Sequence, residues 1–129
     1  MVAYSFKKQF VAPILLGTKC QTIRANGKRR HARPGDALQL YTGMRTKQCR
    51  KIGDAMCRSY ELISINVELW AISTGVFPKF TAWPEWLDDF ARRDGFADRF
   101  EMRDFWLKAH GPGLFQGVLI RWQEFRPAI

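Results

Sequence analysis

The chain has 129 residues, and its 21 Lys and Arg against 12 Asp and Glu give a formal net charge of +9 at pH 7. Because one domain typically has about 100–200 residues, this length predicts a single domain over 1–129, with no separate cofactor domain. Hydrophobic residues make up 47% of the chain, which is enough for a core. None of the apolar runs approaches the roughly 20 residues that cross a bilayer, so the composition excludes both disorder and a membrane span.

Cysteine usage and the N-terminal segment both bear on location. Three cysteines cannot all pair, so we expect free thiols in a reducing compartment and not a disulfide framework. The first ten residues, MVAYSFKKQF, lack the cationic-then-apolar order of a signal peptide. We therefore expect a cytoplasmic protein that has no membrane partner.

The positive charge is concentrated in the N-terminal half. Residues 1–60 carry 13 Lys or Arg and two acids, a net charge of +11, whereas residues 61–129 have a net charge of −2. So uneven a field favours anionic partners, with nucleotides and nucleic acids first among them. The alternative is a basic protein whose charge only keeps it soluble.

The N-terminal half predicts three short strands and one helix. Apolar residues at helical spacing end at Gly17, in the position of a C-terminal cap, and Pro13 must lie in the first turn of that helix. Asn26-Gly27 is a turn signal at the start of a basic loop. The predicted elements are a strand over 3–6, a helix over 8–16, a strand over 20–24, the basic loop over 26–33 and a strand over 37–42.

The C-terminal half predicts a long β segment, two helices and a last strand. Pro84 suits the first position of one helix. Asp98, with Glu101 three residues later, is typical of a capping box that begins a second helix. The predicted elements are a polar loop over 43–53, one or two strands over 55–73, a helix over 84–93, a helix from 98 to the glycine at 111 and a strand over 117–125.

The predicted order is β-α-β-β-β-α-α-β. Strands that follow one another without intervening helices argue against a doubly wound parallel sheet. The pattern instead favours an α+β fold in which a small antiparallel or mixed β-barrel is flanked by about three helices.

Most motifs of common chemistry are missing from the sequence. No glycine-rich nucleotide loop occurs. Seven residues separate Cys49 from Cys57, and His31 and His110 lie far from both, so we expect neither a metal site nor a cofactor. Among the tryptophans, which favour core packing, Trp83 stands at a helix entrance and is the best candidate to stack on a planar base.

The segment from Gly17 to Arg24 combines three side chains that can do chemistry. Lys19, Thr22 and Arg24 follow a helix end within eight residues, and alternation places Thr22 and Arg24 on one face of a strand. A threonine hydroxyl becomes a nucleophile when a neighbouring base takes its proton. The alternative is that these residues have no chemical role. Thr22 would then be an ordinary β-branched strand residue, and Lys19 and Arg24 would be solvated charges.

A series of motifs occupies the first 45 residues. They are Tyr4-Ser5-Phe6, Phe10, Pro13-Ile14-Leu15, Gly17-x-Lys19-x-x-Thr22-Ile23-Arg24 and Pro34-Gly35-Asp36-x-Leu38-x-Leu40-Tyr41-Thr42-Gly43. Together they resemble the ASCH domain family, which is related to PUA RNA-binding domains and shares their small β-barrel. The likeness weakens after residue 45 and returns around Asp94-Gly95-Phe96.

Within that family the sequence is most similar to the small bacterial N4-acetylcytidine amidohydrolases, which are understood to use a lysine, a threonine and a glutamate. The resemblance implies that Lys19 and Thr22 are catalytic, and that Asp94 takes the place of the acid. Aspartate is one methylene shorter than glutamate, which departs from the family pattern. Asp94 also fits a helix-ending turn.

The resemblance therefore predicts an enzyme that cleaves the amide of an N4-acylated cytosine or cytidine. Lys19 would take the proton of Thr22, which attacks the carbonyl, or Lys19 and Asp94 would activate water directly. Burial and the cations of Arg24 and of residues 28–30 would lower the pKa of Lys19. We predict that Arg24, Tyr41 and Arg45 contact the substrate.

The competing hypothesis is an RNA-binding module or a metal-independent ribonuclease. Many PUA-like relatives bind RNA, and the basic loop offers a cluster of cations that can track phosphates. Its members are Lys28, Arg29, Arg30 and Arg33.

Overall fold

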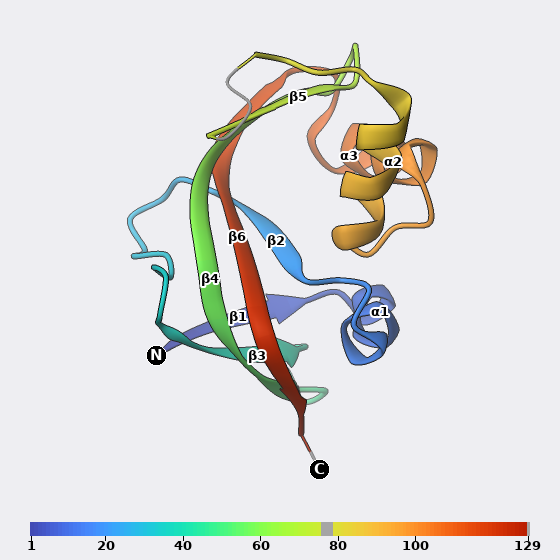
Figure 1. The fold of residues 1–129 in the computed structure, drawn as a ribbon. Coiled ribbons are helices and arrows are strands. Elements are labelled where there is room, and N and C mark those ends of the chain that lie inside the picture. The colour runs from blue at the N-terminus through green and yellow to red at the C-terminus, as the bar shows by residue number, and fades with distance from the viewer. Residues whose placement is uncertain (76–78, 129) are drawn as a thin grey trace.

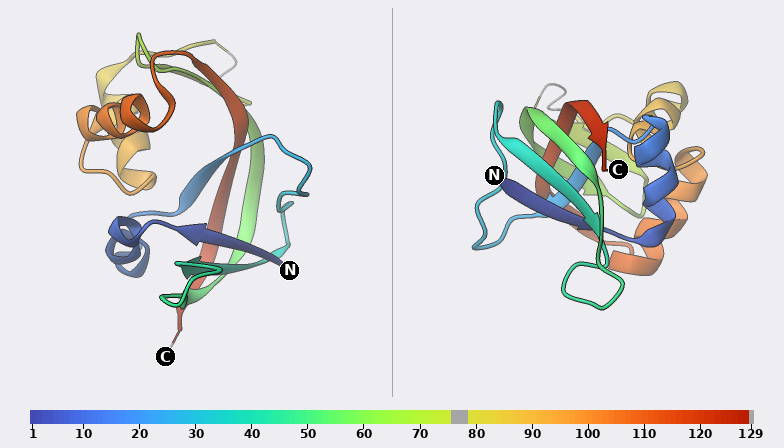
Figure 2. Two further views of the ribbon diagram at one scale, coloured as in Figure 1. Left: turned by 180° about the vertical axis from the view of Figure 1, so that it is seen from behind. Right: turned by 90° about the horizontal axis from the view of Figure 1, so that it is seen from below.

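A computed structural model describes residues 1–75 and 79–128. One strongly curved sheet carries all three α-helices on its concave side (Figures 1 and 2). The two longest strands form the spine of the sheet, with α1 near one end of the spine and α2 and α3 near the other (Figure 1). The α+β class and a mixed sheet with three helices are as predicted.

The N-terminal elements agree closely with the sequence pattern. Pro13 lies in the first turn of the short α-helix, and Gly17 ends that helix with a φ of 83°, a left-handed conformation that glycine adopts without steric cost. The elements are β1 (Val2–Phe6), a 3₁₀ turn η1 (Lys8–Phe10), α1 (Val11–Leu16), β2 (Gln21–Ala25) and β3 (Ala37–Thr42).

The predicted β segment in the middle of the chain forms two strands, β4 (Arg50–Asn66) and β5 (Ala71–Thr74). The predicted loop over 43–53 is wrong at its C-terminal end, because β4 begins at Arg50. Arg50 pairs with Thr42 and Asp54 with Gln39 in an antiparallel ladder with β3. This basic segment has little strand character of its own, so pairing with its neighbour extends the strand.

The C-terminal half contains α2 (Pro84–Arg93), α3 (Arg99–His110) and β6 (Leu114–Pro127). Pro84 occupies the first turn of α2, as predicted. Asp98 caps α3 as predicted, because its Oδ1 accepts from the Glu101 backbone N–H at 2.9 Å. The reciprocal bond of a capping box is displaced by one residue, since Glu101 Oε1 accepts from the Ala97 N–H at 3.3 Å. The last strand is longer than predicted at both ends, since it pairs with β4 from Leu114 to Pro127.

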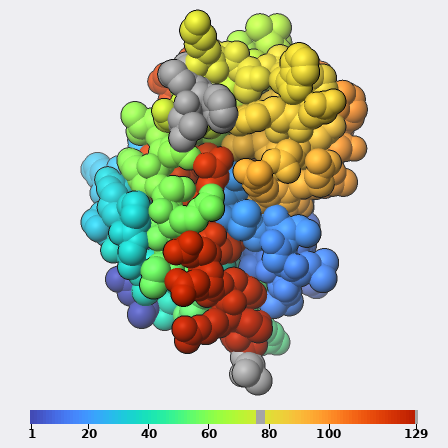
Figure 3. Space-filling model, in the orientation of Figure 1, coloured from blue at the N-terminus to red at the C-terminus, as the bar shows by residue number. Residues whose placement is uncertain are grey.

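The strands pair in the order β1-β3-β4-β6-β2, and β5 pairs with β4 beyond this path. Among the ladders formed by the described residues, β1–β3 is the parallel one and the others are antiparallel. Within residues 1–75 and 79–128 the ladders leave the sheet open between β1 and β2, so the predicted barrel is not closed by backbone pairing. The C-terminal half of β6 lies at the surface between β4 and α1 (Figure 3).

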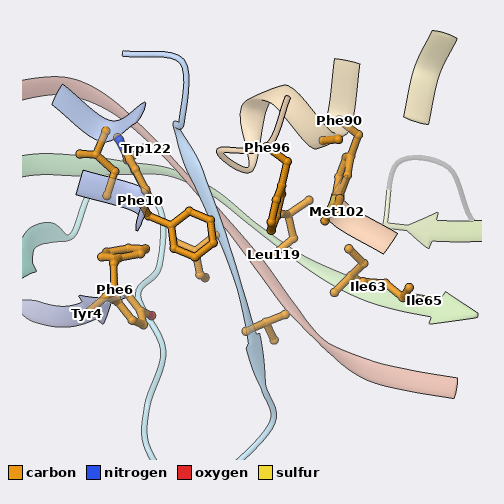
Figure 4. Packing of buried hydrophobic residues seen from close by; sticks show 14 of the residues in the cluster. Tyr4, Phe6, Phe10, Ile63, Ile65, Phe90, Phe96, Met102, Leu119 and Trp122 are labelled. Carbon is orange, nitrogen blue, oxygen red and sulfur yellow. The ribbon is translucent and has the colours of Figure 1, made fainter. Parts of the chain in front are cut away.

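A single hydrophobic core fills the concave side of the sheet. Phe90 and Met102 from the C-terminal helices lie over Ile63, Ile65 and Leu119 of the two long strands (Figure 4). Aromatic side chains from the N-terminal segment occupy the other end of the same core: Tyr4, Phe6 and Phe10. No helix in the described part of the chain is both long and apolar enough to cross a membrane.

Candidate active site

The three side chains predicted to be catalytic line one cavity of about 240 Å³. Lys19 precedes β2, Thr22 lies on β2, and Asp94 follows the last residue of α2. All three are buried, with Lys19 only 3% exposed. Segments separated by more than 70 residues in the chain are thus brought to one place, and Arg24 lines the same cavity.

The cavity lies where the sheet is open. Ser5 and Phe6 of β1 form part of its wall, and Thr22 and Arg24 of β2 form another part. Arg24 spans the gap between the two strands, because its Nη2 donates to the Ser5 carbonyl at 2.8 Å. A side chain thus joins the strands at the point where a closed barrel would have a backbone ladder.

Asp94 is held in place by the end of α2. The N–H of Phe96 donates to the carbonyl of Ala91, and the N–H of Gly95 donates to that of Arg92. These two bonds form a Schellman motif, in which Gly95 has a φ of 97°. The motif turns the chain sharply and leaves the Asp94 carboxyl directed into the protein.

Lys19 is fixed by Asp94 from one side and by aromatic rings from another. Its Nζ donates to the Asp94 backbone carbonyl at 2.6 Å and lies 3.8 Å from the carboxylate oxygen Oδ1. The same Nζ lies 4.7 Å from the centre of the Phe10 ring and 5.5 Å from that of Phe6. The amine therefore has a defined position in an apolar surrounding.

Burial shifts the pKa values of both groups away from their charged forms. Burial lowers the pKa of the Lys19 ammonium; the Asp94 carboxylate opposes this shift, and the Arg24 guanidinium adds to it. Burial raises the pKa of the Asp94 carboxyl, against the influence first of Lys19 and then of Gln21 and Arg24. Both shifts favour a neutral pair, in which Lys19 can accept a proton. Residues 28–30 are not among the groups that shift the pKa of Lys19.

Thr22 is paired with Arg24. The Arg24 Nε donates to Thr22 Oγ1 at 2.9 Å, and its guanidinium carbon lies 5.0 Å from the ring centres of Tyr4 and Phe6. A hydroxyl oxygen that accepts from a cation can still donate its own proton in another direction. This arrangement stabilises negative charge as it develops on Oγ1 and leaves the hydroxyl proton available to a base.

Gln21 belongs to the site, although the sequence did not single it out. It is fully buried, and its Nε2 donates to Asp94 Oδ1 at 3.3 Å. Its Oε1 accepts from Arg121 Nε at 3.4 Å, and Arg121 Nη1 donates to Glu61 Oε2 at 2.6 Å. A polar chain thus runs from the cavity into the sheet and orients the Asp94 carboxyl. A glutamine on a short strand carries no sequence signal of this role.

Aromatic side chains form most of the remaining cavity wall. They are Phe6, Phe10, Phe96, Phe105, Trp106 and Phe115. Such walls exclude water, strengthen the electrostatic interactions inside and can stack on a planar ring. Trp83, the predicted stacking residue, is 64% exposed and does not line the cavity, whereas Trp106 does.

Two of the predicted substrate contacts lie outside the cavity wall. Tyr41 is paired with Ser5 in the β1–β3 ladder, and Arg45 is an exposed residue of the β3–β4 connection with a φ of 67°. Neither lines the cavity. The reason is topological, because β3 lies on the far side of β1 from β2. Of the three residues predicted to contact the substrate, Arg24 is the one that lines this cavity.

The basic loop over 26–33 makes contacts within the fold. Arg29 donates to the Ala3 carbonyl and lies over the Tyr4 ring, and Arg30 pairs with Asp36 at 3.0 Å. Arg33 lies 3.8 Å from the centre of the Tyr60 ring.

Within the described residues, no group of three or more His, Cys, Asp or Glu side chains is placed where it could hold a metal ion.

Comparison with models of known protein families finds no match to this chain. Comparisons with curated proteins and with solved structures also find no match.

We predict that Gly95→Ala disturbs the site, whereas Gly17→Ala costs only backbone strain. Both glycines have positive φ, but a Cβ at Gly95 would lie 2.9 Å from Lys19 Cδ and 3.0 Å from Phe10 Cδ1, while nothing lies within 4 Å of one at Gly17. Urea denaturation should show losses of about 1 kcal/mol for Gly17→Ala and about 2–4 kcal/mol for Gly95→Ala. Equal losses would contradict the close contact between Gly95 and Lys19.

Proposed function

We propose that the protein is an amidohydrolase that cleaves the acyl-amide bond of an N4-acylated cytosine or cytidine and releases a carboxylic acid. The observation that carries the proposal is that the buried side chains of Lys19, Thr22 and Asp94 line one cavity whose remaining wall is largely aromatic. Its volume of about 240 Å³ is smaller than the roughly 300–1,000 Å³ of sites for drug-sized ligands, which favours a small planar substrate. The resemblance of residues 4–45 to the ASCH domain family supports the same chemistry.

In the proposed mechanism the neutral amine of Lys19 takes the proton of Thr22 while Oγ1 attacks the acyl carbonyl carbon. The tetrahedral intermediate then collapses, the carbon–N4 bond breaks, and the Lys19 ammonium returns the proton to the departing amino group. Water attacks the acyl-threonine ester, with Lys19 again as base, and releases the acid. The lowered pKa of Lys19 supports this role, because a general base must be unprotonated at working pH.

Arg24 and Asp94 support the reaction in different ways. Arg24 donates to Thr22 Oγ1 and so stabilises the charge that develops as the proton leaves. Asp94 fixes the Lys19 amine through its backbone carbonyl, and its carboxyl is itself oriented by Gln21. A variant in which Lys19 and Asp94 activate water directly uses the same side chains without a covalent intermediate.

We also propose that the fold belongs to the PUA-like class and that the protein is cytoplasmic. The mixed sheet flanked by three helices is compatible with this fold class, with the opening between β1 and β2 occupied by the site. The three unpaired cysteines are compatible with a reducing compartment.

The first test measures hydrolysis of N4-acetylcytidine by the ultraviolet change on deacylation. We expect Lys19→Ala and Thr22→Ala to lower kcat/KM by at least about 100-fold, as loss of a base or a nucleophile does. Thr18→Ala and Lys108→Ala are matched controls, because both residues are exposed and outside the cavity wall; they should retain activity.

Three results would decide between versions of this proposal. Wild-type protein that is inactive on several N4-acyl cytosines would refute the function. Full activity of Lys19→Ala would refute the mechanism while leaving the function in place. Mass spectrometry of protein quenched during turnover should show Thr22 heavier by one acyl group. If this acyl-threonine is absent under burst conditions, direct attack by water is favoured.

RNA binding is the second candidate, and the exposed basic loop is the observation that favours it. Lys28, Arg29, Arg30 and Arg33 are all exposed, although the last three also contact the fold. If RNA is the ligand, affinity for a single-stranded oligonucleotide should fall steeply between about 50 and 200 mM salt. Turnover of a neutral acylated nucleoside should change little over the same range. A steep salt dependence together with no deacylation would replace the amidohydrolase with an RNA-binding module.

A further inference from the structure

A second depression adjoins the candidate active site. This groove has a volume of about 660 Å³ and shares Ser5, Phe6 and Lys7 with the wall of the catalytic cavity. Its other lining residues are Lys8 of η1, Thr42 at the end of β3, Gly43 and Gln48 of the β3–β4 connection, and Arg50 at the start of β4. The end of β1 is therefore a common wall between the two spaces.

The groove is cationic. Lys7, Lys8 and Arg50 line it, and its described lining residues include no acid. The ion pair of Lys51 with Asp54 lies next to it in sequence, but neither residue is part of the lining. A groove lined by basic residues of one sign concentrates anions, and phosphate is the anion that lysine and arginine bind most readily in nucleotide sites.

Hydrogen bonds anchor the common wall on both sides. On the cavity side the Ser5 carbonyl accepts from Arg24 Nη2 at 2.8 Å. On the groove side the Ser5 Oγ accepts from the Met44 N–H at 3.2 Å, and Thr42 Oγ1 donates to the Phe6 carbonyl at 2.8 Å. These bonds tie the end of β1 to β2 and to the end of β3, so a ligand that contacts both spaces would be positioned by this one segment.

We propose that this groove binds the ribose-linked phosphate of a nucleotide whose acylated base lies in the cavity. The inference rests on the proposed amidohydrolase function and narrows its substrate class, from a free base or nucleoside to a phosphorylated N4-acylcytidine. Lys8 and Arg50 are the phosphate-binding residues of this site. Lys7 lines both spaces, and its Nζ also lies 5.0 Å from the centre of the Phe105 ring.

The test compares kcat/KM for N4-acetylcytidine with that for its 5′- and 3′-monophosphates and for a short RNA that contains the same base. Wild type should prefer one of the monophosphates over the nucleoside. Lys8→Ala and Arg50→Ala should each reduce that preference by about three- to fivefold, as expected for exposed ion pairs. Lys47→Ala is the matched control, because it removes a lysine from the same β3–β4 connection but outside the groove, and the preference should persist.

Binding of the deacylated products separates this inference from the proposed function. Calorimetry with cytidine and with the two cytidine monophosphates needs no turnover. If no substrate is hydrolysed but a monophosphate binds more tightly than cytidine, and Lys8→Ala and Arg50→Ala lose that difference, the amidohydrolase fails and the phosphate site stands. Equal kinetics and equal binding of nucleoside and nucleotides would overturn the phosphate site, as would a preference confined to the RNA.

Discussion

The burial of Lys19 against Asp94 is the constraint on which the rest of the site depends. A charged ammonium and a charged carboxylate inside an apolar wall lose several kcal/mol of hydration each, and their attraction compensates only when the geometry is good. Here the amine is 3% exposed and lies 3.8 Å from the carboxylate oxygen, with phenylalanine rings on its other side. Burial therefore moves both pKa values towards the neutral forms. A lysine so placed contributes little as a structural charge but is well suited to accept and return a proton.

Two glycine turns and the strand order of the sheet together produce this burial. Gly17 and Gly95 turn the chain after α1 and α2, and these turns bring Lys19 and Asp94 together. The strand order leaves the opening between β1 and β2, where Arg24 takes the place of a backbone ladder. Had those strands paired along their length, the space that Thr22 lines would be occupied by main chain. The candidate site is thus the part of the sheet that is left unpaired.

The sequence predicted what local signals encode and missed what the tertiary structure decides. Gly17, Pro84 and the Asp98–Glu101 pair are local signals, and each forms the predicted helix boundary. The motif from Gly17 to Arg24 likewise located the cavity residues of β2. Tyr41 and Arg45 lie outside the cavity wall because the order of strands, which no local pattern states, puts β3 beyond β1. Gln21 and the aromatic wall were missed because the sequence does not show which buried residues face a cavity. A glutamine or a phenylalanine in a core and one in a cavity wall have the same sequence pattern. The uneven charge of the chain, which by itself predicted only an anionic partner, includes the lysines and the arginine that line the groove beside the cavity.

The most direct test of this account is the titration of Lys19 itself. Protein with ¹³C-labelled lysine shows each Cε resonance shifting as its amine loses a proton, and the spectrum of Lys19→Met assigns the Lys19 signal. We expect Lys19 to titrate below the ordinary pKa of a lysine side chain, because burial disfavours its ammonium form. If Lys19 instead titrates near about 10.4, the ordinary pKa of a lysine side chain, its amine is charged at neutral pH. The proposed general base would then not exist.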